Sequence, residues 1–281
     1  MPDASNLTGH WVTDRLDSPW LELAPLSESG PSTRLAGQVL NLKGEPLPGV
    51  TLSMGDRSTT TDDTGRFLLG DLGAGHRVLE IDGTTANEPG RSYGTFEAGV
   101  DLNKDELNVL PYTIWMPVID TAHAQTIPSP ATEDVILTTP RIPGLEVVIP
   151  AGSVVKDEDG DVVAKLGITA VPTDRPPFPL PSFFETPVYF TVQPGGSYVF
   201  PRGARIIYPN YHHQVPGARV EFWNYDPEER GWYIYGHGTV TPDGRQIVPD
   251  PGVRVYEFSG AMINDGNTPP GKGPKCSWWS T

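Results

Sequence analysis

The stretch LAGQVLNLKGEPLPGVTLSMGDRSTTTDDTGRFLLGDLGAGHRVLEIDG, residues 35–83, decides the fold class of this chain. Apolar and polar residues alternate in short runs, and glycine, proline or aspartate separates one run from the next. Alternation with a period of two is typical of strands that bury one face, and the separating residues favour tight turns. The stretch therefore predicts a small antiparallel β-sandwich.

The charged segment TDDTGRF, residues 61–67, has two interpretations. Asp62 and Asp63 could bind calcium, but a calcium loop needs more oxygen ligands at alternating positions. Aspartate side chains also accept hydrogen bonds from nearby backbone N–H groups, and Gly65 tolerates the positive φ of a tight turn. We therefore predict a turn between two strands.

The same stretch resembles carboxypeptidase regulatory-like modules, which are transthyretin-related sandwiches. The resemblance rests on Gly37 and Val39 and on the segments 44–50, 59–67 and 75–81, and it covers residues 34–120. It implies a β-sandwich. It implies little about function, because such modules accompany many different activities.

Three further parts complete the chain. Residues 1–33 carry aromatic residues and prolines without periodicity and are expected to form an extended lead-in, whereas residues 121–263 contain short strand-like runs that predict a second β-domain. Residues 264–281 are rich in Gly and Pro and are predicted to be a flexible tail. No helical period is visible, so the sequence predicts an all-β chain of two antiparallel β-sandwich domains in tandem, with little helix.

Composition argues against several classes of function. The formal net charge of −15 disfavours nucleic acid as a partner, because phosphate groups require a basic surface. No apolar stretch is long enough to span a membrane, so membrane insertion is not expected. The first residues, MPDASNLTGHW, lack the regions of a signal peptide, so the chain is expected either to be cytosolic or to have been cut from a larger exported protein. An extracellular location, or export as part of a larger protein, is the favoured expectation.

Neither a cofactor nor an enzymatic activity is expected. The six histidines form no metal-binding motif, and the single cysteine, Cys276, lies in the Gly/Pro-rich tail. The acidic segment 157–161 contains a D-x-D-G sequence that is explained by a hairpin turn without a metal. One alternative is self-cleavage between Phe258 and Ser259, but Glu257 stands where self-cleaving β-domains carry the histidine that activates the serine.

An aromatic hairpin is predicted between residues 221 and 235. Alternate residues of a strand point to opposite faces. One face is therefore expected to enter the domain core, and the other to cover a neighbouring domain or to form an exposed surface for a glycan or a protein. The candidate binding residues are Phe222, Trp223, Tyr225, Trp232, Tyr233 and Tyr235.

The second half extends the resemblance to most of residues 7–263. The segments VIPAGSVV (148–155), VYFTVQPGG (188–196) and GARVEFWNYDPEERGWYIYG (217–236) resemble the region upstream of the YD-repeat shell in bacterial Rhs proteins, which are related to toxin-complex proteins and teneurins. In that family a transthyretin-related domain precedes a fibronectin-like plug domain that closes one end of a hollow β-shell around a toxin or other cargo. No YD repeats follow in this sequence.

This resemblance implies a non-catalytic structural module that supports or seals a YD-repeat shell, supplied in cis or in trans. Two alternatives remain open: a cell-surface adhesion or carbohydrate-binding module that uses the aromatic hairpin, and a self-cleaving β-domain.

Overall fold

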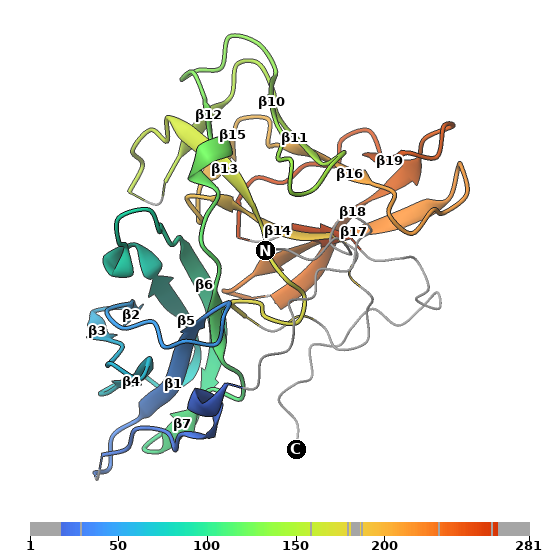
Figure 1. Ribbon diagram of the computed structural model, residues 1–281. Coiled ribbons are helices and arrows are strands. Elements are labelled where there is room, and N and C mark those ends of the chain that lie inside the picture. The colour runs from blue at the N-terminus through green and yellow to red at the C-terminus, as the bar shows by residue number, and fades with distance from the viewer. Residues whose placement is uncertain are drawn as a thin grey trace.

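The segment that begins the predicted sandwich forms strand β1 in the computed structural model of the protein (Figure 1). The structure describes residues 18–263, except residues 29, 158, 179, 181–185, 187, 230 and 260. Most of the predicted lead-in and the whole predicted tail therefore lie outside the described residues. Within the described part, helical turns are limited to the short 3₁₀ segments η2 (Pro19–Glu22), η3 (Gly83–Ala86) and η4 (Thr121–His123), so the all-β prediction is confirmed.

Strands β1–β8, here called the first unit, form two four-stranded sheets. One sheet contains β4 (Arg66–Leu69), β1 (Arg34–Asn41), β7 (Leu107–Val109) and β8 (Ile114–Met116). The other has the order β3 (Arg57–Thr60), β2 (Thr51–Met54), β5 (Gly75–Asp82) and β6 (Thr95–Leu102). The pairs β1–β7 and β1–β8 are parallel, whereas the other strand pairs of the two sheets are antiparallel, as in the predicted sandwich. Parallel neighbours need a long crossover, and the second sheet supplies it.

The core of the first unit follows from alternation along its strands. In β6, residues alternate strictly between partly exposed and buried positions, with Phe96, Ala98, Val100 and Leu102 turned inward. Phe67 of β4 fills the space over Gly37, where a Cβ atom would lie 2.7 Å from its ring. A larger residue at position 37 would therefore have to displace the Phe67 ring.

Strands β9–β20, here called the second unit, form one ten-stranded antiparallel sheet and a two-stranded ribbon. The sheet order is β10 (Val135–Leu137), β11 (Glu146–Ile149), β16 (Arg205–Pro209), β19 (Gln246–Pro249), β18 (Gly231–Val240), β17 (Arg219–Asp226), β20 (Ala261–Ile263), β14 (Val188–Gln193), β13 (Lys165–Ala170) and β9 (Gln125–Thr126). The ribbon consists of β12 (Val154–Lys156) and β15 (Tyr198–Phe200). The sheet curls, so that β10 approaches β13 and the strands enclose an apolar core.

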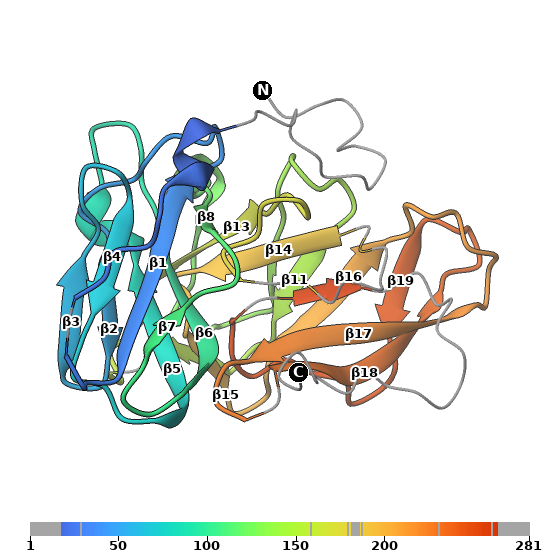
Figure 2. The same ribbon diagram turned by 90° about the horizontal axis from the view of Figure 1, so that it is seen from below.

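The two units lie side by side in both views (Figures 1 and 2). The described sheets of the first unit end at Met116, and those of the second begin at Gln125. All six residues of β14 are buried, because one face of this strand lines the core of the second unit while Tyr189 on the other face packs in the core of the first. β14 is therefore covered on both faces and lies where the two units meet.

Candidate functional site at the junction of the two units

Alternation along β17 sends its aromatic side chains to two different cores. Phe222 packs in the core of the second unit, whereas Trp223 and Tyr225 belong to the apolar cluster of the first unit. Trp232 of β18 pairs with Tyr225 in the β17–β18 register and joins the same cluster. The hairpin therefore connects the two cores through its opposite faces.

The aromatic junction is the group formed by Phe178, Tyr189, Trp223, Tyr225 and Trp232, all of them buried. Phe178 stacks on Tyr225 with a centroid distance of 4.2 Å and an interplanar angle of 21°. Trp232 lies 5.4 Å from Tyr225, and its contact with Tyr189 is edge-to-face at 5.8 Å. Offset-stacked and edge-to-face pairs stabilise a core beyond the apolar area that they bury. The junction thus has the packing of a protein interior.

Hydrogen bonds fix the position of the first unit on this cluster. The backbone N–H of Gly99 on β6 donates to the Tyr225 hydroxyl at 2.9 Å. The Gln193 side chain continues the edge of β6 as a strand would: its amide N–H donates to the Thr95 carbonyl at 3.1 Å, and its oxygen accepts from the Thr95 N–H at 3.2 Å. Buried polar groups are costly unless they are paired, so these contacts select one relative position of the two units.

Arg175 of the second unit makes a further contact with the first unit. Arg175 is 4% exposed, and its guanidinium lies 5.2 Å from the ring centroid of Trp115 in β8. It also donates to the carbonyl of Leu42 at the end of β1. Cation–π contacts strengthen when the cation is desolvated, as it is here.

The predicted exposed aromatic surface on the hairpin is wrong. Phe222, Trp223, Tyr225 and Trp232 are between 0% and 8% exposed. Phe222 is buried in the core of the second unit, and the first unit covers the other three. Tyr233 and Tyr235 are half-buried. The alternative interpretation, in which one face enters the core and the other contacts the neighbouring domain, is confirmed.

Sequence reasoning did not assign Phe178, Tyr189 and Gln193 to this site. Phe178 lies in the proline-rich segment PTDRPPFPLP, residues 172–181. The run VYFTVQ carried a usable signal, since a strand with apolar residues at consecutive positions is typical of burial on both faces.

Aromatic side chains are exposed elsewhere, on the β12–β15 ribbon. Tyr198 and Phe200 lie two residues apart on β15 and are 41% and 43% exposed, while Val199 between them is buried. Val154 and Lys156 of β12 pair with Phe200 and Tyr198 in register. The outer face of the ribbon therefore presents two adjacent aromatic rings to solvent.

A groove of about 350 Å³ borders the junction. It lies between the outer face of the β2–β5–β6 sheet and two loops of the second unit, the one that follows β12 and the one that precedes β15. Its carboxylates are Glu80, Asp82, Glu97, Asp157 and Asp159. Several of them already accept hydrogen bonds, such as Glu80 from the Ser53 hydroxyl at 2.8 Å and Asp157 from the Asp161 N–H at 2.8 Å. In the described part of the chain, no group of three or more His, Cys, Asp or Glu residues is placed to hold a metal ion.

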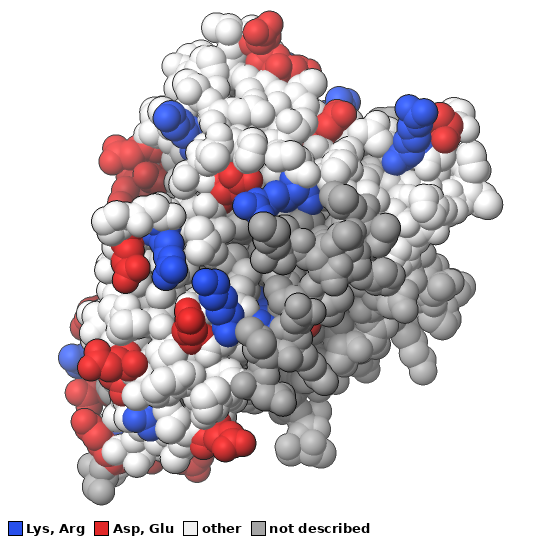
Figure 3. Space-filling view, viewed as in Figure 1, with Lys and Arg blue, Asp and Glu red and all other residues white. Residues whose placement is uncertain are grey.

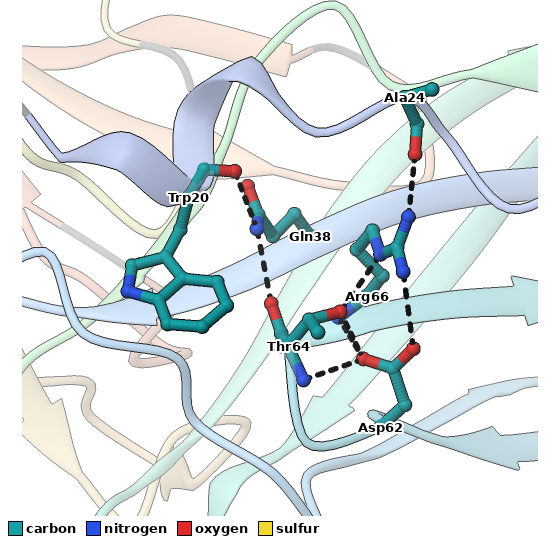
Figure 4. A network of polar contacts seen from close by, with 6 residues as sticks. All are labelled: Trp20, Ala24, Gln38, Asp62, Thr64 and Arg66. Atoms are coloured by element: carbon teal, nitrogen blue, oxygen red, sulfur yellow. Dashed lines mark hydrogen bonds and ion pairs between the residues drawn. The ribbon is translucent and has the colours of Figure 1, made fainter.

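The acidic segment that follows β3 forms a closed turn (Figure 4). Asp62 accepts hydrogen bonds from the backbone N–H groups of Thr64 at 2.8 Å and Arg66 at 3.0 Å, and Gly65 has a φ of 72°. Arg66 also donates to the carbonyl of Ala24, which ties the described part of the lead-in to the turn. The carboxylate is thus used by the turn, as the sequence predicted.

The acidic segment before Val162 forms a turn of the same kind. Asp157 accepts from the Asp161 N–H, and Gly160 has a φ of 84°. Glu158 lies outside the described residues. A hairpin explains the described carboxylates here without a ligand.

The Phe258–Ser259 step is buried beside the hairpin. Phe258 is 4% and Ser259 is 9% exposed, and the Ser259 hydroxyl donates to the carbonyl of Tyr225. This hydrogen bond directs the hydroxyl proton to a backbone oxygen of β17. It gives Ser259 a structural role in fixing the chain next to β20.

Charged side chains are interspersed on the face seen in Figure 3, where acidic and basic residues alternate without a single dominant patch. Among the described residues, no helix is both long and apolar enough to cross a membrane.

Comparisons with known proteins give little further information. No protein-family description matches the sequence, and no curated protein matches it. Among solved structures, the chain is similar to part of a type II cohesin–X-dockerin complex from Acetivibrio cellulolyticus, with 21% identity and a TM-score of 0.24 over 32% of this chain and 60% of the other. It is also similar to the Bacillus anthracis TIE protein, with 15% identity and a TM-score of 0.25 over 82% of this chain and 48% of the other.

Proposed function

We propose that this chain is a non-catalytic structural module that supports or seals a YD-repeat shell around a toxin or other cargo. The observation that carries the proposal is the aromatic junction, in which side chains of the second unit pack into the apolar core of the first. A module that closes or supports a hollow shell must be rigid. A packed apolar interface between two domains resists hinge motion of one domain against the other.

The resemblance of residues 7–263 to the region upstream of YD-repeat shells supplies the partner in this proposal. The contact surface that we propose is the outer face of the β12–β15 ribbon, with Tyr198 and Phe200 at its centre. Aromatic residues are enriched at the buried centres of protein interfaces, where they contribute a large share of the binding free energy.

The test uses the full chain and a YD-repeat shell protein supplied in trans. We expect the two to co-elute on size exclusion, and the double variant Tyr198→Ser/Phe200→Ser to lose the complex while its melting temperature stays within a few degrees. Val215→Ser is the matched control, because Val215 is 71% exposed on the loop before β17. The proposal fails if the shell does not bind at all. If the shell binds the double variant as tightly as the unmodified chain, the contact surface lies elsewhere.

A second candidate function is carbohydrate binding on the same ribbon. Two exposed rings at i and i+2 of a strand lie about 7 Å apart, a spacing that allows adjacent sugar rings to stack on them. Pull-down on insoluble polysaccharides tests this alternative. Retention that the double variant loses, together with no binding to the shell, would favour a glycan-binding module exported as part of a larger protein.

A further inference from the structure

His76 on β5 contacts both units through its two ring nitrogens. Its Nδ1 lies 2.9 Å from a carboxylate oxygen of Asp101, the residue paired with it on β6. Its Nε2 lies 2.8 Å from the backbone carbonyl oxygen of Pro227, in the turn between β17 and β18. The imidazole therefore bridges a sheet edge of the first unit and a turn of the second.

Both contacts are made to acceptors. A carboxylate and a backbone carbonyl accept hydrogen bonds and do not donate them, while a neutral imidazole carries only one N–H group. Only the imidazolium form of His76 donates to both oxygens. In the neutral form, one nitrogen lone pair faces an oxygen lone pair at less than 3 Å, which is repulsive.

The negative charge of Asp101 decides which contact is lost on deprotonation. A single proton is held more strongly on Nδ1, where its hydrogen bond to the carboxylate is charge-assisted. Nε2 then faces the Pro227 carbonyl without a proton. Loss of one proton thus removes the hydrogen bond from His76 to Pro227 of the second unit and keeps the hydrogen bond from His76 to Asp101 of the first unit.

The surroundings of His76 favour the charged form. Asp101 faces it from β6, and Asp226 at the end of β17 adds a second negative charge. Glu228 and Glu229 lie in the turn that follows Asp226. The neighbouring Arg77 directs its guanidinium to the carbonyl of His76. Partial burial lowers the pKa of His76, but the hydrogen bonds to Pro227 and Asp101 and the charges of Asp101 and Asp226 outweigh it and raise the pKa above 6.5.

The absence of a side chain at Gly99 allows the turn to approach His76 closely. Gly99 of β6 lies beneath the contact, and a Cβ atom there would be 2.6 Å from the Pro227 oxygen and 2.9 Å from the His76 ring. The turn can relieve the repulsion by moving away from β6.

We propose that His76 is a pH-sensitive latch that holds the β17–β18 turn on the β5–β6 edge when it is protonated and releases the turn when it is neutral. A group with a raised pKa stabilises the folded form fully below its unfolded pKa, and this stabilisation disappears as the pH rises through the folded pKa. The turn is therefore held below pH 6.5 and released above the pKa of His76, while the aromatic junction keeps the two units together.

The test follows the full chain by NMR and by hydrogen exchange between pH 5.5 and 8.5. We expect the His76 ring to titrate above 6.5, and the protection factors of Gly99 and the turn amides to fall about fivefold across that midpoint, as for the loss of one hydrogen bond. His76→Gln should abolish this pH dependence. His237→Gln, which removes an exposed histidine of β18, should preserve it.

Asp101→Asn provides an independent variant, because it removes the charge but keeps a polar side chain. It should move the midpoint to lower pH. The latch is refuted if His76 titrates at or below 6.5, or if the protection factors have the same pH profile in His76→Gln as in the unmodified chain.

Discussion

Truncation of Trp232 measures how far the two units share one interior. Trp232 is 6% exposed and lies within 6.0 Å, between ring centroids, of Phe178, Tyr189 and Tyr225. Replacement of a buried large aromatic side chain by alanine costs about 3–5 kcal/mol of unfolding free energy. For a chain of this size, each kcal/mol lowers the melting temperature by about 2–4 °C, so Trp232→Ala should lower it by roughly 6–20 °C.

The informative assay is urea unfolding followed by hydrogen exchange and mass spectrometry, with separate peptides from β5–β6 and from β11 and β16. Because the junction belongs to the apolar cluster of the first unit, we expect both sets of peptides to unfold at one midpoint and to shift together in Trp232→Ala. Tyr256→Ala, at a tyrosine that is 54% exposed, should change the unfolding free energy by no more than about 0.5 kcal/mol. A variant in which only one of the two sets of peptides shifts would refute the shared interior.

Four further outcomes are expected. Gly99→Ala should cost about 1–3 kcal/mol in urea unfolding, because its Cβ would lie 2.6 Å from the Pro227 oxygen; an unchanged midpoint would contradict this close approach. Burial raises the pKa of Asp62, but hydrogen bonds from Thr64 and Arg66 hold it below its ordinary value of 3.8. The stability that this carboxylate contributes is present above pH 3.8 and lost as the pH falls through the lowered pKa, so Asp62→Asn should show a weaker acid dependence of the melting temperature. Calcium should leave the melting temperature unchanged, whereas a bound ion at 100 times its Kd would add about 2.7 kcal/mol. The chain should remain uncleaved on denaturing gels for days, and a fragment that ends at Phe258 and disappears in Ser259→Ala would overturn this.

The local sequence pattern was sufficient to predict several strands and turns of the first unit. Alternation predicted β1 and β4, and the turn chemistry of Asp62 and Gly65 predicted the connection between β3 and β4. The parallel pairing of β1 with β7 and β8 was not predictable in this way, because it depends on where the chain returns after the second sheet.

The candidate site was only partly predictable for the same reason. Alternation correctly separated Phe222 from Trp223, but it did not reveal that both faces of β17 are covered. That outcome depends on Phe178 and Tyr189, which approach the hairpin from distant parts of the sequence. The exposed rings of Tyr198 and Phe200 likewise depend on which face of the β12–β15 ribbon meets the core.

The position of β20 in the ten-stranded sheet has a consequence for the order of folding. β20 (Ala261–Ile263) follows all the other described strands in the chain, yet it pairs with β17 on one side and β14 on the other. A nascent chain that has emerged only as far as β19 therefore holds two unpaired strand edges, one on each side of a missing strand. Unpaired edges are templates for aggregation. The sheet closes only when residues 261–263 arrive, so we expect truncations before residue 261 to aggregate even though they retain the complete first unit.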